Sequence, residues 1–384
     1  MKLSSRHEWV QRSELRSMSV KCEQVGGVNL SQGVCDLTIP ASVREAAKHA
    51  IDHGPNSYSR HDGTRALREA VAENYRRRAD LDVDPETNVV VSAGATGALY
   101  CACLALLEPG DEVVLFEPYY SYHRSTLVAT GAVPVYVRTR APDWSIDFDA
   151  FEAAISDRTR AVIINTPSNP SGKIWTREEL STMAALCEKH DLIAFTDEIY
   201  EYFLYDDMEH VCPATLPGMK DRTITISGLS KTFSITGWRI GYCLAPADVA
   251  QAIGNFSDLV YVCAPTPLQL GAAAGLVSLD DDYFTELADK YRAKRDRLCA
   301  TLSDVGLTPC IPQGAYYVLA DTSGLPGRTG TERAMYLLET TGVAAVPGQT
   351  FFTGSEGHGM VRFCFAKEDD VIDEACRRLE SGLK

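Results

Sequence analysis

Short apolar, β-branched runs alternate with longer stretches of helical periodicity between residues 88 and 244. The runs predict strands at 89–91, 112–116, 132–137, 161–164, 192–196, 223–226 and 240–244. The stretches predict helices at 96–107, 121–130 and 176–190, the last with Thr176 as N-cap and Glu179 closing a capping box. Apolar strands that alternate with helices are typical of a largely parallel sheet covered on both faces. We therefore expect an α/β fold in which ligands bind beyond the carboxyl ends of the strands.

The length of 384 residues predicts two domains. We expect residues 41–266 to form the large domain, with a mostly parallel sheet between two layers of helices (α/β/α). Residues 1–40, as an N-terminal arm, and residues 267–384 should pack together as a smaller α+β domain. Its strands are expected within 309–321 and 343–365.

Composition excludes several classes of protein. The formal net charge of -15, without a visible Lys/Arg cluster, argues against a nucleic-acid binder. No apolar run approaches the length that crosses a bilayer, and residues 1–23 lack the apolar segment of a secretory leader. The twelve cysteines lie mostly in apolar segments and show no Cys-x-x-Cys spacing. We therefore expect buried thiols, no metal and a cytoplasmic location.

A lysine that follows a short apolar strand is the first candidate for chemistry, in Ser-Gly-Leu-Ser-Lys231-Thr-Phe-Ser-Ile-Thr-Gly-Trp-Arg239-Ile-Gly. Small neighbours can partly desolvate the Lys231 ammonium, which favours the free amine, a nucleophile toward an aldehyde. Arg239 lies beside two glycines that permit close backbone approach, and its guanidinium suits a phosphate. An exposed loop lysine is the alternative, which the arginine and the glycines make weaker.

Asp197 ends a predicted buried strand in Thr-Asp197-Glu-Ile-Tyr200. A buried carboxylate needs a cationic partner, which is either a protonated pyridine nitrogen of a ligand or a structural Arg or Lys. Tyr200 can direct its phenol to the same place or belong to the core.

Two further loops lie at strand ends. Asn165-Thr-Pro-Ser-Asn-Pro-Ser-Gly predicts a stiff turn that holds an amide in place. Ser92-Ala-Gly-Ala-Thr-Gly opens a predicted helix, where free N–H groups bind phosphate. Each is an ordinary turn when taken alone, but all four segments follow strands and so predict one site.

Together these segments resemble the aspartate aminotransferase family, the class I, fold-type I enzymes that use pyridoxal 5′-phosphate (PLP). The resemblance covers nearly the whole chain and points to the branch that holds kynurenine, glutamine and methionine aminotransferases. It rests on Asn-x-Pro-x-Asn-Pro-x-Gly at 165–172, Thr-Asp-Glu-Ile-Tyr at 196–200, Ser-Lys-Thr-Phe-Ser-x-Thr-Gly-Trp-Arg-x-Gly at 230–241 and Val-Arg-Phe-Cys-Phe at 361–365. It implies a ping-pong transfer of an amino group between an L-amino acid, neutral or aromatic, and a 2-oxo acid.

The resemblance implies roles around the cofactor ring. Lys231 is the Schiff-base lysine and also moves the proton between the substrate Cα and C4′ of PLP. Asp197 pairs with the pyridine nitrogen and keeps it protonated, so the ring accepts electrons released from Cα. Tyr200 and Asn169 hydrogen-bond the 3′-oxygen, and Tyr120 stacks on the ring face.

The resemblance also implies the phosphate contacts. The amides of Ala95 and Thr96 and the guanidinium of Arg239 bind the phosphate, with Ser230 beside them. Tyr58 reaches the phosphate of the neighbouring subunit, which implies a homodimer with shared sites.

One departure concerns the phosphate. The chain has Gly228 where the family usually has a phosphate-binding serine, three residues before the lysine. Two outcomes stay open: Ser227 or Ser230 compensates, or the phosphate is bound more weakly.

For the substrate, the resemblance implies that Arg362 grips the α-carboxylate bidentately, with the Gly33 backbone and Asn169 nearby. The sequence places no second arginine for the distal carboxylate of a dicarboxylic substrate, which favours a neutral or aromatic side chain.

Two other functions stay open at this point. A β-lyase or cyclase of the same fold uses the same cofactor, because fold alone does not decide the reaction. A non-catalytic sensor of PLP or amino acids is the other, and the presence of Lys231, Asp197 and Arg362 together argues against it.

Overall fold

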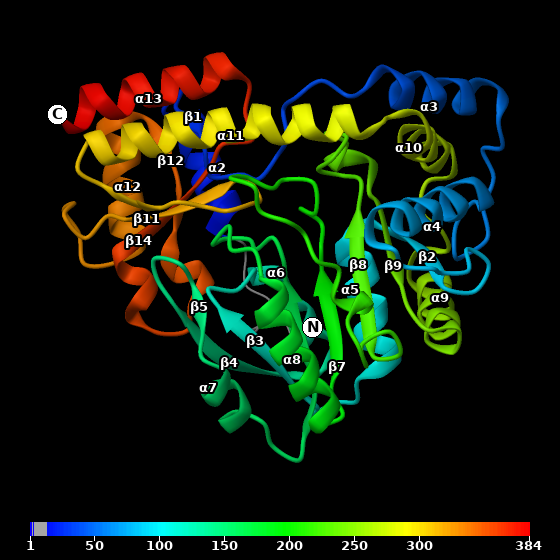
Figure 1. Cartoon of the computed structure of the whole chain (residues 1–384). Coiled ribbons are helices and arrows are strands. Elements are labelled where there is room, and N and C mark those ends of the chain that lie inside the picture. Colours follow the sequence, from blue (N-terminus) through cyan, green and yellow to red (C-terminus); the bar gives the residue numbers. More distant parts are fainter. Residues whose placement is uncertain (2, 4–13) are drawn as a thin grey trace.

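The computed structural model describes Met1, Leu3 and residues 14–384 (Figure 1). Residue 2 and residues 4–13 lie outside the described residues. They belong to the expected N-terminal arm, 1–40, and to the segment 1–23 in which we expect no secretory leader.

The described chain forms an eight-stranded central sheet with the order β2-β9-β8-β7-β6-β3-β4-β5 (Figure 1). Its strands are β2 (Val89–Ala93), β3 (Glu112–Glu117), β4 (Val133–Arg140), β5 (Ser145–Ile146), β6 (Thr159–Asn165), β7 (Ile193–Asp197), β8 (Thr223–Gly228) and β9 (Ile240–Leu244). The strands β9 and β5 run antiparallel to their neighbours, and the other six share one direction. The mostly parallel sheet is thus confirmed.

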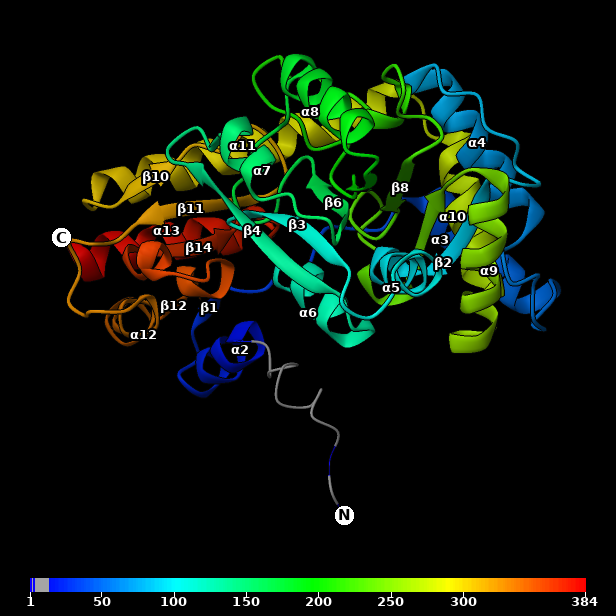
Figure 2. The same ribbon diagram turned by 90° about the horizontal axis from the view of Figure 1, so that it is seen from below.

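Helices cover both faces of this sheet because its buried strands are apolar on both sides. Val113 packs toward α5 (Gly94–Leu106), α6 (Ser121–Thr130) and α9 (Ala247–Tyr261). Its neighbour Val114 packs toward α7 (Phe148–Ala153) and α8 (Arg177–Lys189), where the predicted capping box of Thr176 is present. Figure 2 shows α7 and α8 on one side of β3 and β4, and α5 and α6 on the other. The α/β/α arrangement is confirmed.

Three further helices pack beside the sheet: α3 (Ala41–His53), α4 (Arg65–Ala79) and α10 (Thr266–Ser278). Helix α10 packs against α3 and α4. The boundary expected between residues 266 and 267 stays a prediction, and this packing favours a boundary after α10.

A smaller α+β unit joins the two ends of the described chain. Its antiparallel sheet has the order β10-β11-β14-β13, and a parallel pair joins β1 to β12 with Val28 opposite Val343. The strands are β1 (Val28–Asn29), β10 (Thr308–Cys310), β11 (Tyr317–Asp321), β12 (Val343–Ala344), β13 (Val346–Pro347) and β14 (Met360–Cys364). The helices are α2 (Glu14–Gln24), α11 (Asp281–Asp304), α12 (Gly330–Thr341) and α13 (Asp369–Leu383). This confirms the predicted packing of the N-terminal arm against the C-terminal part.

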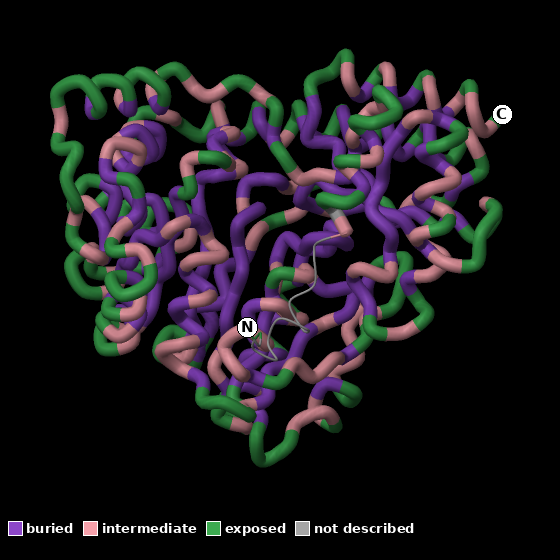
Figure 3. Tube along the Cα trace, turned by 180° about the vertical axis from the view of Figure 1, so that it is seen from behind, coloured by how far each residue is buried: buried purple, intermediate pink, exposed green. Residues whose placement is uncertain are grey.

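Burial follows this plan: the central strands lie in the interior and the outer helix faces are exposed (Figure 3). All twelve cysteines are free thiols, and nearly all of them are buried. In the part of the chain that the structure describes, no helix combines the length and apolarity needed to cross a membrane.

Candidate active site

A cavity of about 400 Å³ lies at the carboxyl ends of the parallel strands. Nine of the twelve predicted site residues line it: Ala95, Thr96, Tyr120, Asn169, Asp197, Tyr200, Ser230, Lys231 and Arg239. The strand ends meet here because β6, β7 and β8 run side by side in the same direction. The predicted segments therefore form one site.

Lys231 lies in a turn after β8 and extends its amine into this cavity. Its Nζ donates a hydrogen bond to the carbonyl oxygen of Gly33 at 3.1 Å. Burial lowers the pKa of the Lys231 ammonium, because the charged form is less well solvated there. The lysine is not an exposed loop residue, and its amine is suited to nucleophilic attack.

Asp197, the last residue of β7, is buried and has a partner that the sequence reasoning missed. Its Oδ2 lies 2.7 Å from Nε2 of His123, and its Oδ1 accepts a hydrogen bond from the Ile199 N–H at 3.3 Å. Among the described residues, no Arg or Lys forms an ion pair with this carboxylate. This favours a protonated ring nitrogen of a ligand in the cavity over a structural cation as the partner of the Asp197 carboxylate.

His123 is positioned by the first turn of α6. Its ring packs edge-on against the Tyr120 ring, with the centroids 5.2 Å apart. The sequence held one signal for His123, its position three residues after Tyr120. Residues three apart at the start of a helix share a face, and Tyr120 was already predicted to face the cofactor.

The loop after β6 ties several of these groups together. The Asn165 amide donates to the backbone oxygen of Asp197 at 2.9 Å, and its Oδ1 accepts from the Asn169 N–H at 2.7 Å. Asn165 also lines the cavity. The predicted stiff turn therefore holds Asn169 in place through a second asparagine that had been given no role.

Two tyrosines stand beside the position of the ring. Burial raises the pKa of Tyr120 and of Tyr200 well above the usual range, so both phenols stay protonated. The Tyr200 hydroxyl lies 3.1 Å from the Tyr317 hydroxyl. Tyr200 thus lines the cavity and is not only part of the core.

The start of α5 forms a cradle suited to a phosphate. The N-cap residue Ala93 supplies no side-chain hydrogen bond, so the first N–H groups of the helix are open. Gly94 has φ +75°, and a Cβ there would lie 2.2 Å from Nη2 of Arg239. A Cβ on Gly241 would lie 2.4 Å from the Ala95 nitrogen. Glycine at both positions keeps this cradle free of side chains.

The structure distinguishes the two serines near the phosphate cradle. The Ser227 hydroxyl donates to the Glu201 carboxylate at 2.8 Å, whereas Ser230 lines the cavity. A Cβ on Gly228 would meet the Gly241 Cα at 2.9 Å, so the close approach of β8 and β9 leaves no room for a serine there.

Arg362 is buried on β14, next to the cavity. Its Nη1 donates to Oδ1 of Asn169 at 2.9 Å and its Nη2 to the Ser31 carbonyl at 2.7 Å, while its Nε has no partner among the described residues. A buried guanidinium that meets no carboxylate among the described residues is suited to bind an anion from outside the chain. A surface arginine is excluded.

Gly33 and Tyr58 lie differently from the nine cavity residues. Gly33 contacts the site through its carbonyl oxygen, and a Cβ there would lie within 2 Å of the Tyr317 hydroxyl, so no larger residue can replace it. Tyr58 is 80% exposed and does not belong to the described lining of the cavity in its own chain.

The residues present suit PLP. They supply an amine with a lowered pKa, a carboxylate that pairs with no Arg or Lys of the described residues, and the open N–H groups at the start of a helix for the phosphate. Arg362, which contacts the cavity residue Asn169, adds a guanidinium suited to a carboxylate.

Comparison with known proteins agrees with this geometry. The family model for aminotransferase class I and II matches residues 25–379. The kynurenine–oxoglutarate transaminase 3 of Rattus norvegicus is 36% identical over 378 residues, which cover 91% of this chain and 83% of that protein. The methionine aminotransferase of Escherichia coli is 33% identical over 364 residues, which cover 94% of each chain.

A solved structure agrees as well. The N-succinyldiaminopimelate aminotransferase of Mycobacterium tuberculosis has 36% sequence identity and a TM-score of 0.95, and the match covers 99% of this chain and 100% of that one. All three of these proteins are named as aminotransferases, which favours transamination over the lyase, cyclase and sensor alternatives. The chain therefore belongs to the class I and II aminotransferase family and is a PLP-dependent transaminase.

Proposed function

We propose that this transaminase moves an amino group between a neutral or aromatic L-amino acid and a 2-oxo acid by a ping-pong mechanism, with Lys231 as the catalytic residue. The observation that carries the proposal is the placement of the Lys231 amine and the Asp197–His123 pair in one cavity. PLP supplies an aldehyde and a ring that accepts the electrons released at the substrate Cα. Lys231 would hold PLP through its aldehyde group, and its amine would carry the proton to and from the substrate Cα.

The other groups hold and orient the cofactor. Asp197 keeps a proton on the ring nitrogen, and His123 fixes the carboxylate orientation through the 2.7 Å contact. Tyr120 covers one face of the ring, and Tyr200 and Asn169 bind its 3′-oxygen.

The phosphate is bound by the first N–H groups of α5, at Ala95 and Thr96, with Ser230 and Arg239 beside them. The open helix start and the two glycines that a Cβ would block support this part of the proposal.

Arg362 binds the α-carboxylate of each substrate. Its two Nη groups are held by Asn169 and Ser31, and its Nε has no partner among the described residues. These contacts support a guanidinium that is oriented before the substrate binds. Gly33 contributes its backbone beside the same carboxylate.

The side chain of the amino donor meets apolar and aromatic groups, among them Leu99, Phe195 and the stacked rings of Tyr120 and Tyr122, whose centroids are 5.3 Å apart. The curated relatives named for methionine and kynurenine support the same class of donor.

We further propose a homodimer in the cytoplasm. Tyr58 is an exposed aromatic residue outside its own cavity, which supports a contact with the phosphate in a second subunit. The free thiols support a reducing compartment.

Borohydride reduction tests the covalent role of Lys231, because it converts a carbon–nitrogen double bond between a lysine and an aldehyde into a stable amine. Peptide mapping by mass spectrometry of the PLP-loaded protein is expected to find the label on Lys231. A label on another lysine, or none in cofactor-saturated protein, would refute the assignment. In parallel, loss of the visible absorbance on addition of single amino acids identifies the donor.

A further inference from the structure

One cation of the cavity wall has no task in the proposed function. The charged groups that line the cavity are Arg16, Lys231, Arg239 and Asp197. Lys231 and Arg239 serve the cofactor, and Asp197 its ring nitrogen. Arg16 is exposed, and within the described part of the chain it has no ion pair and no hydrogen bond.

Helix α2 places Arg16 there, and contacts hold this helix beside Arg362. The Ser19 hydroxyl lies 3.2 Å from the Ser31 hydroxyl, and the Ser31 carbonyl accepts from Nη2 of Arg362 at 2.7 Å. Residues three apart share a helix face, so Arg16 lies on the same face as Ser19. Arg16 therefore lies on the helix face that contacts Ser31, and Ser31 in turn contacts Arg362.

A second anchor lies at the start of α2. The Thr350 hydroxyl donates to the Glu14 carboxylate at 3.3 Å. The next residue, Phe351, has its ring 5.1 Å from the guanidinium carbon of Arg362. Helix α2 also packs on β1, β12 and β13 of the small domain, and Figure 2 shows it beside β1. Arg16 therefore lies between two points that are both tied to the surroundings of Arg362.

These positions suit a substrate with two carboxylates. Arg362 is buried and binds the α-carboxylate, which leaves the rest of the substrate to extend into the cavity. A guanidinium binds a carboxylate with two parallel hydrogen bonds, and Arg16 is the unpaired guanidinium at the cavity wall. The phosphate does not need it, because the phosphate cradle is built from α5 and from Arg239.

We infer that Arg16 binds the distal carboxylate of a dicarboxylic 2-oxo acid, which is the amino acceptor of the proposed reaction. This inference rests on the proposed function and names the substrate class of its second half. A ping-pong enzyme binds both substrates in one cavity at different times. A neutral donor leaves the exposed Arg16 in water, so the same cavity accepts both classes.

The test compares two acceptors that differ at one group. In 2-oxopentanoate a methyl group replaces the distal carboxylate of 2-oxoglutarate, with the same number of carbons. Both are assayed with the wild-type holoenzyme, with Arg16→Gln and with Arg77→Gln, a matched control that removes an exposed arginine of α4 outside the cavity lining.

Arg16→Gln is expected to raise KM for 2-oxoglutarate by about tenfold or more, because a charge-assisted pair is lost. The KM for 2-oxopentanoate should stay within about twofold, kcat should hold for both acceptors, and Arg16→Lys should recover part of the loss. The control should match the wild type. Equal changes for both acceptors, or no change for either, would overturn the inference.

A binding measurement decides the matter without turnover. Calorimetry on the PLP-loaded protein gives Kd for glutarate and for pentanoate, which again differ only in the distal carboxylate. The wild type should prefer glutarate, and Arg16→Gln should lose this preference. If Arg16→Gln loses the preference for glutarate but the wild type transfers no amino group, the proposed function fails, and only the binding of a distal carboxylate by Arg16 remains. If transfer occurs and Arg16→Gln leaves the preference intact, only the inference fails.

Discussion

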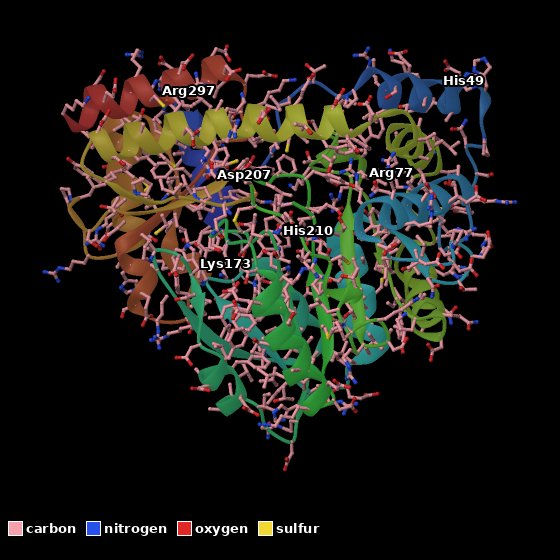
Figure 4. All side chains as sticks on the ribbon, in the orientation of Figure 1. His49, Arg77, Lys173, Asp207, His210 and Arg297 are labelled. Atoms are coloured by element: carbon pink, nitrogen blue, oxygen red, sulfur yellow. The ribbon has the colours of Figure 1, made fainter. Side chains whose placement is uncertain are left out.

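A half-buried carboxyl group beside the site, that of Glu201, provides a test of the structure. Glu201 follows Tyr200 and accepts hydrogen bonds from the hydroxyls of Ser227 at 2.8 Å and Tyr242 at 3.3 Å. Burial raises the pKa of Glu201 from its ordinary 4.5 to about 7; the nearby His210, labelled in Figure 4, acts in the opposite direction, and a second carboxylate adds to the rise. Glu201 is therefore protonated in the folded protein at mildly acidic pH.

The variant Glu201→Gln keeps the shape of the side chain and removes its titration. Each factor of ten between the folded and unfolded acid constants is worth about 1.4 kcal/mol, so this difference corresponds to about 3 kcal/mol at most. Below pH 4.5 the group is protonated in both states. Between pH 4.5 and 7 the folded state holds more protons, so the stability that Glu201 contributes falls as pH rises and is lost above pH 7.

The free energy of unfolding of Glu201→Gln should therefore rise relative to wild type by up to about 3 kcal/mol between pH 4.5 and 8. Urea unfolding followed by tryptophan fluorescence, at equal protein concentration and at half-unit pH steps, measures this difference. The exposed Glu339→Gln on α12 controls for the loss of one carboxyl group. A difference between Glu201→Gln and wild type that stays flat over this pH range would refute the reasoning.

Three substitutions test the catalytic site. Lys231→Ala is expected to abolish turnover while PLP still binds without a covalent link. Visible spectra of the dialysed protein and a product assay check this. Full activity of the variant would contradict the assignment. Arg362→Ala should lower kcat/KM by about a hundredfold, mainly through KM, because a buried charged contact to the substrate is lost; steady-state kinetics and PLP titration measure this, and a collapse of cofactor affinity alone would exclude the role. His123→Phe should lower kcat by about tenfold or more, because Asp197 loses a charge-assisted partner. His123→Asn should recover part of this loss. Equal pH–rate profiles for the two variants and the wild type would count against a positioning role of His123.

Much of the fold could be predicted from local pattern. Apolar runs that alternate with helical periodicity predicted the seven long strands of the central sheet and the helices α5, α6 and α8, because burial on both faces demands continuous apolar strands. The short edge strand β5 was missed, since Ser145–Ile146 carries too few residues for a pattern. The domain boundary at 266–267 stays a prediction, because no feature of a sequence states which surface a helix such as α10 packs against.

In the candidate site, too, some residues could be predicted from local sequence and others only from packing. Residue type and position after a strand predicted Lys231, Asp197 and Arg239 as candidates, and the family resemblance added Arg362. His123 and Arg16 carry no such local signal, and only the packing of α6 and α2 brings them to the cavity.

By itself, the sequence determined the class of fold, since the alternation of apolar strands and helices is a local pattern. It also predicted the reacting amine and the main anion-binding groups, from residue types and from a family resemblance. Tertiary structure decided which groups meet. It paired Asp197 with His123, turned Ser227 away toward Glu201, and brought the N-terminal Arg16 close to the surroundings of Arg362. These contacts join residues far apart in the chain, and their energies arise only when folding excludes water from between them.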